Sequence, residues 1–233
     1  MPKKSYFQFC PIAMAVEVLE PRWTMLILRE LCLGSSRFNE IRRGVPRMSP
    51  TLLSKRLREL EENGIISRSV HTHNKLLIEY QLTPSGHDFI NVIMEVGNWG
   101  KKWIDSKDSL QNTDVELLMW DIRRNLHAEH FPLTFGVVQL HLTDAVARHC
   151  NWWVIFAPGA EPDLGPIEPP EEVNLFIETD TLTLTEIWLG YKSIEKACEV
   201  KALQLLGPQS LIKSVPNWLG PSAFANIESL NNR

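Results

Sequence analysis

One segment, residues 49–82, constrains the fold of this chain more than any other. It begins with Ser49 and Pro50, which favour the start of a helix because serine caps the first turn and proline fits its first position. We expect this helix to cover residues 49–63 and to end before Gly64, which tolerates the left-handed conformation common after a helix. Its apolar stripe consists of Leu53, Leu57 and Leu60. The spacings of four and three residues predict one buried side and one polar side, mostly basic toward the start of the helix.

Two segments rich in β-branched and apolar residues follow this helix, at residues 65–70 and 76–82. A polar turn over residues 71–75 separates them. This pattern predicts a β-hairpin with a projecting loop.

Helices are expected on both sides of this region. Helical periodicity covers residues 11–33 in two segments, and Pro21 is expected to open the second of them. A shorter helix covers residues 37–43, and the run Thr83-Pro84-Ser85-Gly86 leads into a long helix over about residues 86–105. The last three of the helices before the hairpin, the two-stranded hairpin itself and the long helix make a winged helix-turn-helix.

Such a fold suits the recognition of duplex DNA. A major groove admits one α-helix, whose N-terminal side chains meet base edges while nearby basic groups contact phosphates. Between residues 37 and 68 there are eight Lys and Arg against four Glu, so a basic surplus surrounds the helix at 49–63. The alternative is a small helical domain with a solvated basic face. The candidate DNA-contacting residues are Arg37, Arg47, Ser49, Thr51, Ser54, Lys55, Arg58, Arg68, His73 and Lys75.

Charge is distributed unevenly along the chain. Residues 1–105 carry 15 Lys and Arg against 11 Asp and Glu, a net charge of +4, whereas residues 106–233 carry 9 against 17, a net charge of −8. This asymmetry places any phosphate-seeking surface in the first half, although random surface variation would also explain the charge by itself.

Other function classes find little support. No apolar run approaches the ~20 residues that span a bilayer, and no signal-peptide block follows the first residues, so we expect a cytoplasmic protein without membrane insertion. The four cysteines are far apart, which argues against disulfides and a zinc site. His127 and His130 could share a helix face, but there is no third convincing ligand, P-loop, GxGxxG or Ser/His/Asp motif. We therefore expect no enzyme, metal or cofactor.

The first hundred residues also resemble the HxlR family of winged-helix regulators. The resemblance covers about residues 9–104 and rests on many separated motifs in order. These are Cys10-Pro11-Ile12, Arg22-Trp23, Ile27-Leu28-Arg29-Glu30-Leu31, Arg37-Phe38-Asn39-Glu40-Ile41, the run Met48 to Leu57, Gly64-Ile65-Ile66, and the run Glu79 to Gly86.

The resemblance implies a homodimer in which the N- and C-terminal helices of domain 1–105 pack together. Such a dimer, which we expect to be a repressor, would read two half-sites of a pseudo-palindromic operator about one helical turn apart. The wing departs from the family pattern, because Lys75-Leu76-Leu77 replaces a Pro-Pro-Arg-like run. Lys75 and His73 are the candidates to replace the arginine that would enter the minor groove.

Cys10 matches a cysteine that responds to oxidants or electrophiles in some members of the family. A thiol becomes reactive when its pKa falls and it is accessible. The alternative is a buried, inert cysteine. Cys10 is thus a candidate redox sensor.

Residues 114–227 predict a second domain of a different kind. Helices are expected at residues 114–129, 181–189, 193–199 and 208–219, and strands at 134–142, 151–156, 173–179 and 201–206. A polar linker is expected at residues 105–113 and a turn-rich loop at 158–170. This mixture makes the fold class α+β.

Large aromatic residues are concentrated in the second domain. They can fill a core or line an apolar ligand pocket. The candidate ligand-binding residues are Trp120, Trp152, Trp153, Phe176, Trp188 and Trp218. Because side chains alternate along a strand, Trp152 and Trp153 cannot both face inward.

This domain also resembles a sterol-carrier-protein-type domain. The likeness rests on the run Leu118 to Arg124, the run Ile177 to Gly190, and Leu205-Leu206-Gly207-Pro208. It implies a hydrophobic tunnel for a lipid-like guest, and hence a hydrophobic small molecule or lipid that modulates DNA binding. The competing interpretation is a lipid carrier or sensor whose helical domain serves mainly dimerisation.

Overall fold

The computed structural model describes residues 5–71, 77–105 and 107–230. The chain divides into two compact units, Met1–Gly97 and Asn98–Arg233, and each is described by itself. Together they form a mixed α+β protein.

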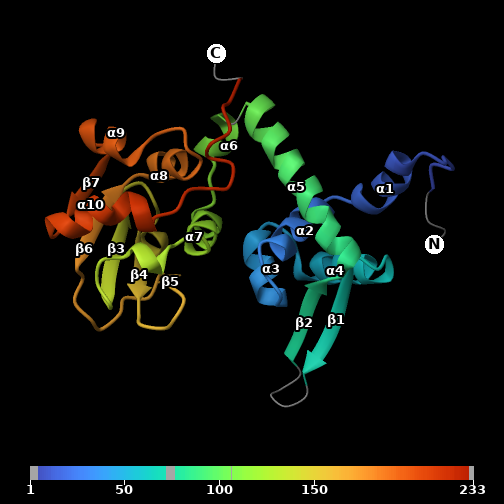
Figure 1. Cartoon of the computed structure of the whole chain (residues 1–233), viewed down its shortest axis with the longest axis horizontal. Helices are drawn as coiled ribbons and strands as arrows, with labels where there is room; N and C mark the ends of the chain where they lie inside the picture. The colour runs from blue at the N-terminus through green and yellow to red at the C-terminus, as the bar shows by residue number, and fades with distance from the viewer. Residues whose placement is uncertain (1–4, 72–76, 106, 231–233) are drawn as a thin grey trace. The chain divides into compact units, whose positions relative to one another are not determined.

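The N-terminal unit holds four helices, a hairpin and most of a fifth helix (Figure 1). Its elements are α1 (Pro11–Leu19), α2 (Thr24–Cys32), α3 (Phe38–Gly44), α4 (Pro50–Glu62), β1 (Ile66–His71), β2 (Leu77–Leu82) and α5 (Pro84–Trp103). The strands pair antiparallel. The prediction that Pro21 opens the second helix was wrong. The helix α2 begins at Thr24, because Pro21 lies in the preceding turn, where the Pro21 carbonyl accepts the Thr24 N–H at 3.0 Å.

The core of this unit forms where the predicted leucine stripe of α4 meets α2, α3 and β1. Leu53, Leu57 and Leu60 are at most 1% exposed. The Ser49 hydroxyl accepts the Leu52 N–H at 3.3 Å, which confirms the expected cap. Burial along one side and a fixed start together determine which residues of α4 face outward.

A buried carboxylate joins α2 to α3. Glu30 is fully buried, and its Oε1 atom accepts Nη2 of Arg29 at 2.8 Å. The same Arg29 nitrogen donates to the carbonyl of Gly44 at 2.8 Å. A Cβ on Gly44 would lie 1.8 Å from the Glu30 carboxyl carbon, so only glycine fits here. This contact fixes the end of α3, from which the chain turns into α4.

The C-terminal unit is built on a five-stranded sheet of order β5-β4-β3-β6-β7. Its strands are β3 (Gly136–Leu142), β4 (Asn151–Phe156), β5 (Asp163–Gly165), β6 (Leu175–Thr179) and β7 (Leu203–Leu206). β3 pairs antiparallel with β4 and parallel with β6, and the remaining pairs are antiparallel.

Helices cover the face of this sheet that carries Val138, Leu140 and Trp152 (Figure 1). They are α7 (Val115–Arg123), α8 (Thr181–Trp188), α9 (Ile194–Glu199) and α10 (Gln209–Trp218). The unit also contains α6 (Lys107–Gln111), which contacts α8, and the 3-10 turns η1 (Ala128–His130) and η2 (Ala147–His149). The main core contains residues of α7, α8, α9 and α10 together with this face.

Three expectations for the second half need correction. The stretch 105–113, expected as a linker, contains the short helix α6. The helix expected at 114–129 ends at Arg123, and its last part is the separate turn η1. The loop expected at 158–170 contains β5, a three-residue strand that pairs with β4. Asp163 and Gly165 are poor strand formers, so pairing with β4, and not local propensity, determines this strand.

Candidate nucleic-acid interface and ligand pocket

The polar face of α4 is the surface on which the DNA prediction depends. Thr51, Ser54, Lys55 and Arg58 are all exposed, at spacings that place them along one side of the helix. The buried leucine stripe lies on the other side. Four side chains that can donate hydrogen bonds therefore project together into solvent from the first three turns of α4.

The basic residues of α4 differ in what they contact. No hydrogen bond or ion pair within residues 5–71, 77–105 and 107–230 engages the Arg58 guanidinium. Lys55 Nζ lies 3.9 Å from Glu59 Oε1, a surface pair of little energetic weight. Arg56 pairs with Glu59 and donates from Nε to the Arg22 carbonyl at 3.3 Å. Arg56 thus attaches α4 to the turn before α2, whereas Arg58 remains available to a partner.

The other predicted contact residues surround α4. Arg47 and Ser49 are exposed in the turn before it, and Arg68 is exposed on β1. Arg37 lies at the start of α3, where its Nη2 is 3.6 Å from Glu79 Oε1 of β2. The last two candidates, His73 and Lys75, lie outside the described residues.

Sequence reasoning passed over two exposed arginines, Arg42 and Arg43, in the last turn of α3. The signal was present in the local basic surplus between residues 37 and 68. The periodicity of so short a helix does not tell which of its side chains face solvent.

Two helices expose an unusual amount of apolar surface. No residue of α1 is buried, although the helix is largely apolar, and Ile12 is 74% exposed. On α5, Val92, Val96, Trp99 and Trp103 are exposed at alternating spacings of four and three. Extended apolar stripes of this kind mark contact surfaces.

Cys10 occupies the N-cap position of α1 and is partly exposed. The backbone N–H groups of Ala13 and Ile12 lower the pKa of its thiol. Burial raises the thiol pKa of Cys32 and of Cys198. Of these three cysteines, Cys10 therefore holds the largest thiolate fraction at a given pH.

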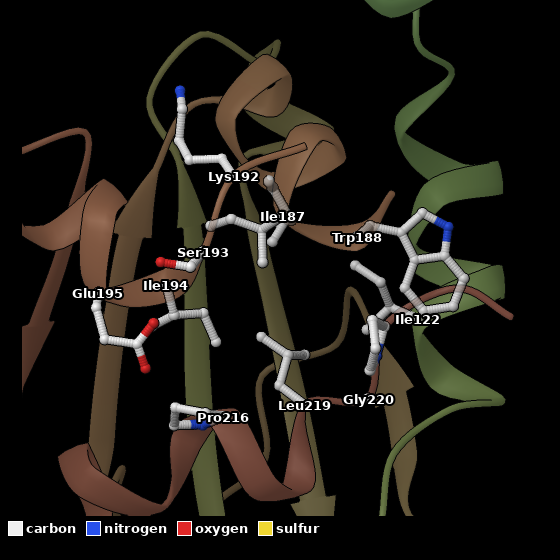
Figure 2. Close-up of a pocket in the computed structure, with 12 residues that line it drawn as sticks. Ile122, Ile187, Trp188, Lys192, Ser193, Ile194, Glu195, Pro216, Leu219 and Gly220 are labelled. Carbon is white, nitrogen blue, oxygen red and sulfur yellow. The ribbon is translucent and has the colours of Figure 1, made fainter. Parts of the chain in front are cut away.

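The C-terminal unit contains a pocket of about 190 Å³ between α7, α8 and the chain after α10 (Figure 2). Its walls are mainly apolar, with a few polar residues at one side. The lining residues are Ile122, Leu184, Ile187, Trp188, Lys192, Ser193, Ile194, Glu195, Pro216, Leu219, Gly220 and Pro221. Trp188 is the one predicted ligand-binding residue among them.

The other five predicted aromatic residues lie elsewhere in the unit. Trp218 is fully buried against Phe131 and Phe156, with ring centroids 5.8 and 5.4 Å away. Trp152 is buried on the helix-covered face of the sheet and donates to the His149 carbonyl at 2.8 Å.

Trp153, adjacent in β4, is buried but lies outside this main core, as strand alternation requires. Trp120 packs beneath the guanidinium groups of Arg123 and Arg124. Phe176 is 43% exposed on β6. These five rings are distributed over the unit and do not line the pocket.

The described part of the chain was also compared with the requirements of a metal site and of a membrane-spanning helix. It contains no group of three His, Cys, Asp or Glu residues arranged to hold a metal ion. Among the described helices, none combines the length and the apolar character that crossing a bilayer requires.

Comparison with known proteins supports the DNA-binding interpretation of the N-terminal unit. The HxlR-like helix-turn-helix family matches residues 18–108. The HTH-type transcriptional regulator YvaP of Bacillus subtilis is 39% identical over 99 residues, which are 42% of this chain and 92% of that protein. YdeP of the same organism is 34% identical over 105 residues, 45% of this chain and 82% of that protein.

A second organism provides a third relative. An HTH-type transcriptional regulator of Methanothermobacter thermautotrophicus is 35% identical over 94 residues, 40% of this chain and 72% of that protein. The residues that the family model matches, 18–108, include the capped helix α4, its exposed polar face and the hairpin that follows. The chain belongs to the HxlR-like family of helix-turn-helix transcriptional regulators.

Proposed function

We propose that the protein regulates transcription as a homodimer that reads two operator half-sites, each with one copy of α4 in the major groove. The observation that carries this proposal is the shared exposure of Thr51, Ser54 and Arg58 on α4, opposite its buried leucines. A major groove about 12 Å wide admits one helix, and its base edges offer acceptors to such donors. The family membership given above already makes the protein a DNA-binding regulator. What is proposed here is the homodimer and the residues that contact DNA.

The proposed contacts divide into two kinds. Thr51, Ser54, Lys55 and Arg58 are assigned to base edges, because they project along one side from the first three turns of the helix. The surrounding residues are assigned to phosphates, which fix the register of the protein without reading sequence. These are Arg37, Arg47, Ser49 and Arg68, with His73 and Lys75 of the wing as further candidates.

The homodimer is supported by the two exposed apolar stripes. A helix as apolar as α1 gains little by folding unless another surface covers it, and α5 carries a stripe with the four-and-three spacing typical of helix–helix contacts. A second copy of the chain supplies the same two helices, so the contact would be self-complementary.

A salt series tests the DNA proposal. Duplexes selected by the protein from a random pool would be titrated by fluorescence anisotropy between about 50 and 200 mM salt. We expect affinity to fall steeply with salt, because each phosphate contact releases a counterion. Lipid binding without any salt-dependent DNA binding would instead favour a carrier or sensor whose N-terminal unit serves dimerisation.

We also propose that the C-terminal unit binds a hydrophobic effector. The pocket beside Trp188 supports this role, as does the resemblance of this half to sterol-carrier-type domains. A guest that binds one arrangement of the dimer more tightly than the other would shift the equilibrium between them. The shift in free energy cannot exceed the difference between the guest's binding free energies for the two arrangements.

We also propose that Cys10 is a redox sensor, through which oxidation would regulate DNA binding in addition to the effector. Its lowered thiol pKa and partial exposure are the two properties that a reactive cysteine needs. Its position at the start of α1 would place any modification beside the proposed dimer contact.

A further inference from the structure

We propose that the pocket beside Trp188 binds a small organic cation: a compact apolar body, about the size of one ring, that carries one ammonium group. This inference rests on the proposed role of the C-terminal unit as the ligand-binding half of the protein. It adds the location, size and charge of the guest.

The volume of the pocket limits the size of the guest. An apolar cavity of about 150 Å³ holds benzene, whereas sites for drug-sized ligands measure about 300–1,000 Å³. At about 190 Å³, this pocket matches a single ring or a short branched chain with one substituent. It is too small for the long lipid that a tunnel would hold.

Apolar side chains from three parts of the unit form the body of the pocket. Ile122 comes from α7, Ile187 and Trp188 from the end of α8, and Leu219 from the chain after α10 (Figure 2). The backbone near Leu219 is held in place, because the Gly220 N–H donates to the Asn125 carbonyl at 3.0 Å. These walls favour a rigid hydrocarbon body.

The polar residues of the pocket determine the charge of the guest. Lys192 is paired with Glu186, and in Figure 2 its side chain extends away from Pro216 and Leu219. The Ser193 hydroxyl already accepts the Lys196 N–H at 3.1 Å. Lys192 therefore offers no uncommitted positive charge to an anionic ligand, and the Ser193 hydroxyl, which can still donate one hydrogen bond, is neutral.

Glu195 is different. Its carboxylate lies at the side of the pocket formed by Ile194 and Pro216 (Figure 2). No hydrogen bond or ion pair with another described residue engages it. A carboxylate at the edge of an apolar pocket favours a guest with an ammonium group at one end. The net charge of −8 over residues 106–233 would attract the same kind of molecule.

Three small compounds of nearly equal shape test this inference on the full-length protein. They are 2-phenylethylamine, which is cationic, 2-phenylethanol, which is neutral, and phenylacetate, which is anionic. Binding would be measured by isothermal titration calorimetry at millimolar ligand. We expect the amine to bind at least about tenfold more tightly than phenylacetate, because charge-assisted hydrogen bonds are the strong ones.

Two substitutions on α9 make the test specific. Glu195→Gln should reduce amine affinity about tenfold, to near that of 2-phenylethanol. Glu199→Gln is the matched control, because Glu199 is exposed on the same helix and does not line the pocket. Circular dichroism would verify that both variants fold. Equal or tighter binding of phenylacetate, no binding of the amine, or an unaltered amine affinity in Glu195→Gln would overturn the proposal.

A second measurement, of DNA affinity in the presence of each ligand, distinguishes failure of this inference from failure of the proposed effector role. If the amine binds as expected but leaves DNA affinity unchanged, the pocket assignment holds and the effector role fails. If a fatty acid binds and alters DNA affinity while the amine does not bind, the effector role holds and this inference fails.

Discussion

Helix α4 and the sheet-based C-terminal unit present functional side chains in opposite ways. In α4 the leucine stripe is buried and the polar face is exposed, so the residues expected to meet DNA are those that reach solvent. In the C-terminal unit four of the six aromatic residues expected to meet a ligand are buried and lie away from the pocket. The comparison teaches that periodicity identifies a surface, whereas aromatic content does not distinguish a core from a binding site. The predictions that follow test each side of this contrast.

The largest effect is expected in the aromatic core. Trp218→Ala should lower the free energy of unfolding of the C-terminal unit by about 3–5 kcal/mol, the usual cost of removing a large buried ring. The ring is fully buried, and its Nε1 donates to the Ser214 hydroxyl at 3.1 Å. Chemical denaturation would measure the loss. Phe176→Ala, at an exposed position of β6, should cost much less, and equal losses in the two variants would contradict the distinction between core and surface rings.

The next effect concerns the apolar stripes of the N-terminal unit. A charge at Val96 on α5 or at Ile12 on α1 should weaken the proposed dimer by at least about 2 kcal/mol, as at the central residues of other interfaces. Sedimentation velocity of Val96→Glu and Ile12→Glu should show a shift from dimer toward monomer.

The neighbouring variant Glu95→Gln provides the control, because Glu95 is exposed one position away from the stripe. A wild-type protein that sediments as a monomer at micromolar concentration would exclude the two-half-site arrangement.

A smaller effect is expected at the proposed DNA contact. Arg58→Ala should weaken binding by about 1–3 kcal/mol and relax specificity at one base pair, if the guanidinium reads a guanine. Lys55→Ala should likewise weaken binding and relax specificity at the base pair that it contacts. Anisotropy titrations on selected duplexes would measure both. Glu62→Gln, at the end of the same helix beyond its third turn, should bind at least as well as the wild type. Unaltered affinity in both basic variants would remove this face from the groove.

The smallest effect is a difference in cysteine reactivity with pH. A thiol with a lowered pKa ionises at lower pH, so Cys10 should keep reacting with iodoacetamide as the pH falls, after Cys32 and Cys198 have become protonated. Mass spectrometry of peptides alkylated over a pH series would compare the three sites. Earlier loss of reactivity at Cys10 than at the other two would exclude it as the sensitive thiol.

Many elements of the N-terminal unit could be predicted because their signals are local. Ser49 caps α4 because its hydroxyl reaches the N–H of Leu52, three residues along the chain. The leucine stripe of α4 buries one side of the helix whichever element packs against it. Pro21 shows where this reasoning fails. Proline at the start of a helix is favourable, but a turn needs the same backbone angle, and the sequence alone does not distinguish the two.

By itself, the sequence determined the order of the main elements, the exposed face of α4 and the membership in the HxlR-like family. Only the tertiary structure decided that β5 is a strand, because three residues acquire that conformation by pairing with β4. The tertiary structure also decided which tryptophan lines the pocket. A pocket arises where segments far apart in the chain, here Ile122, Trp188 and Leu219, fail to fill the space between them. Local periodicity carries no information about that space, since packing of distant segments determines it.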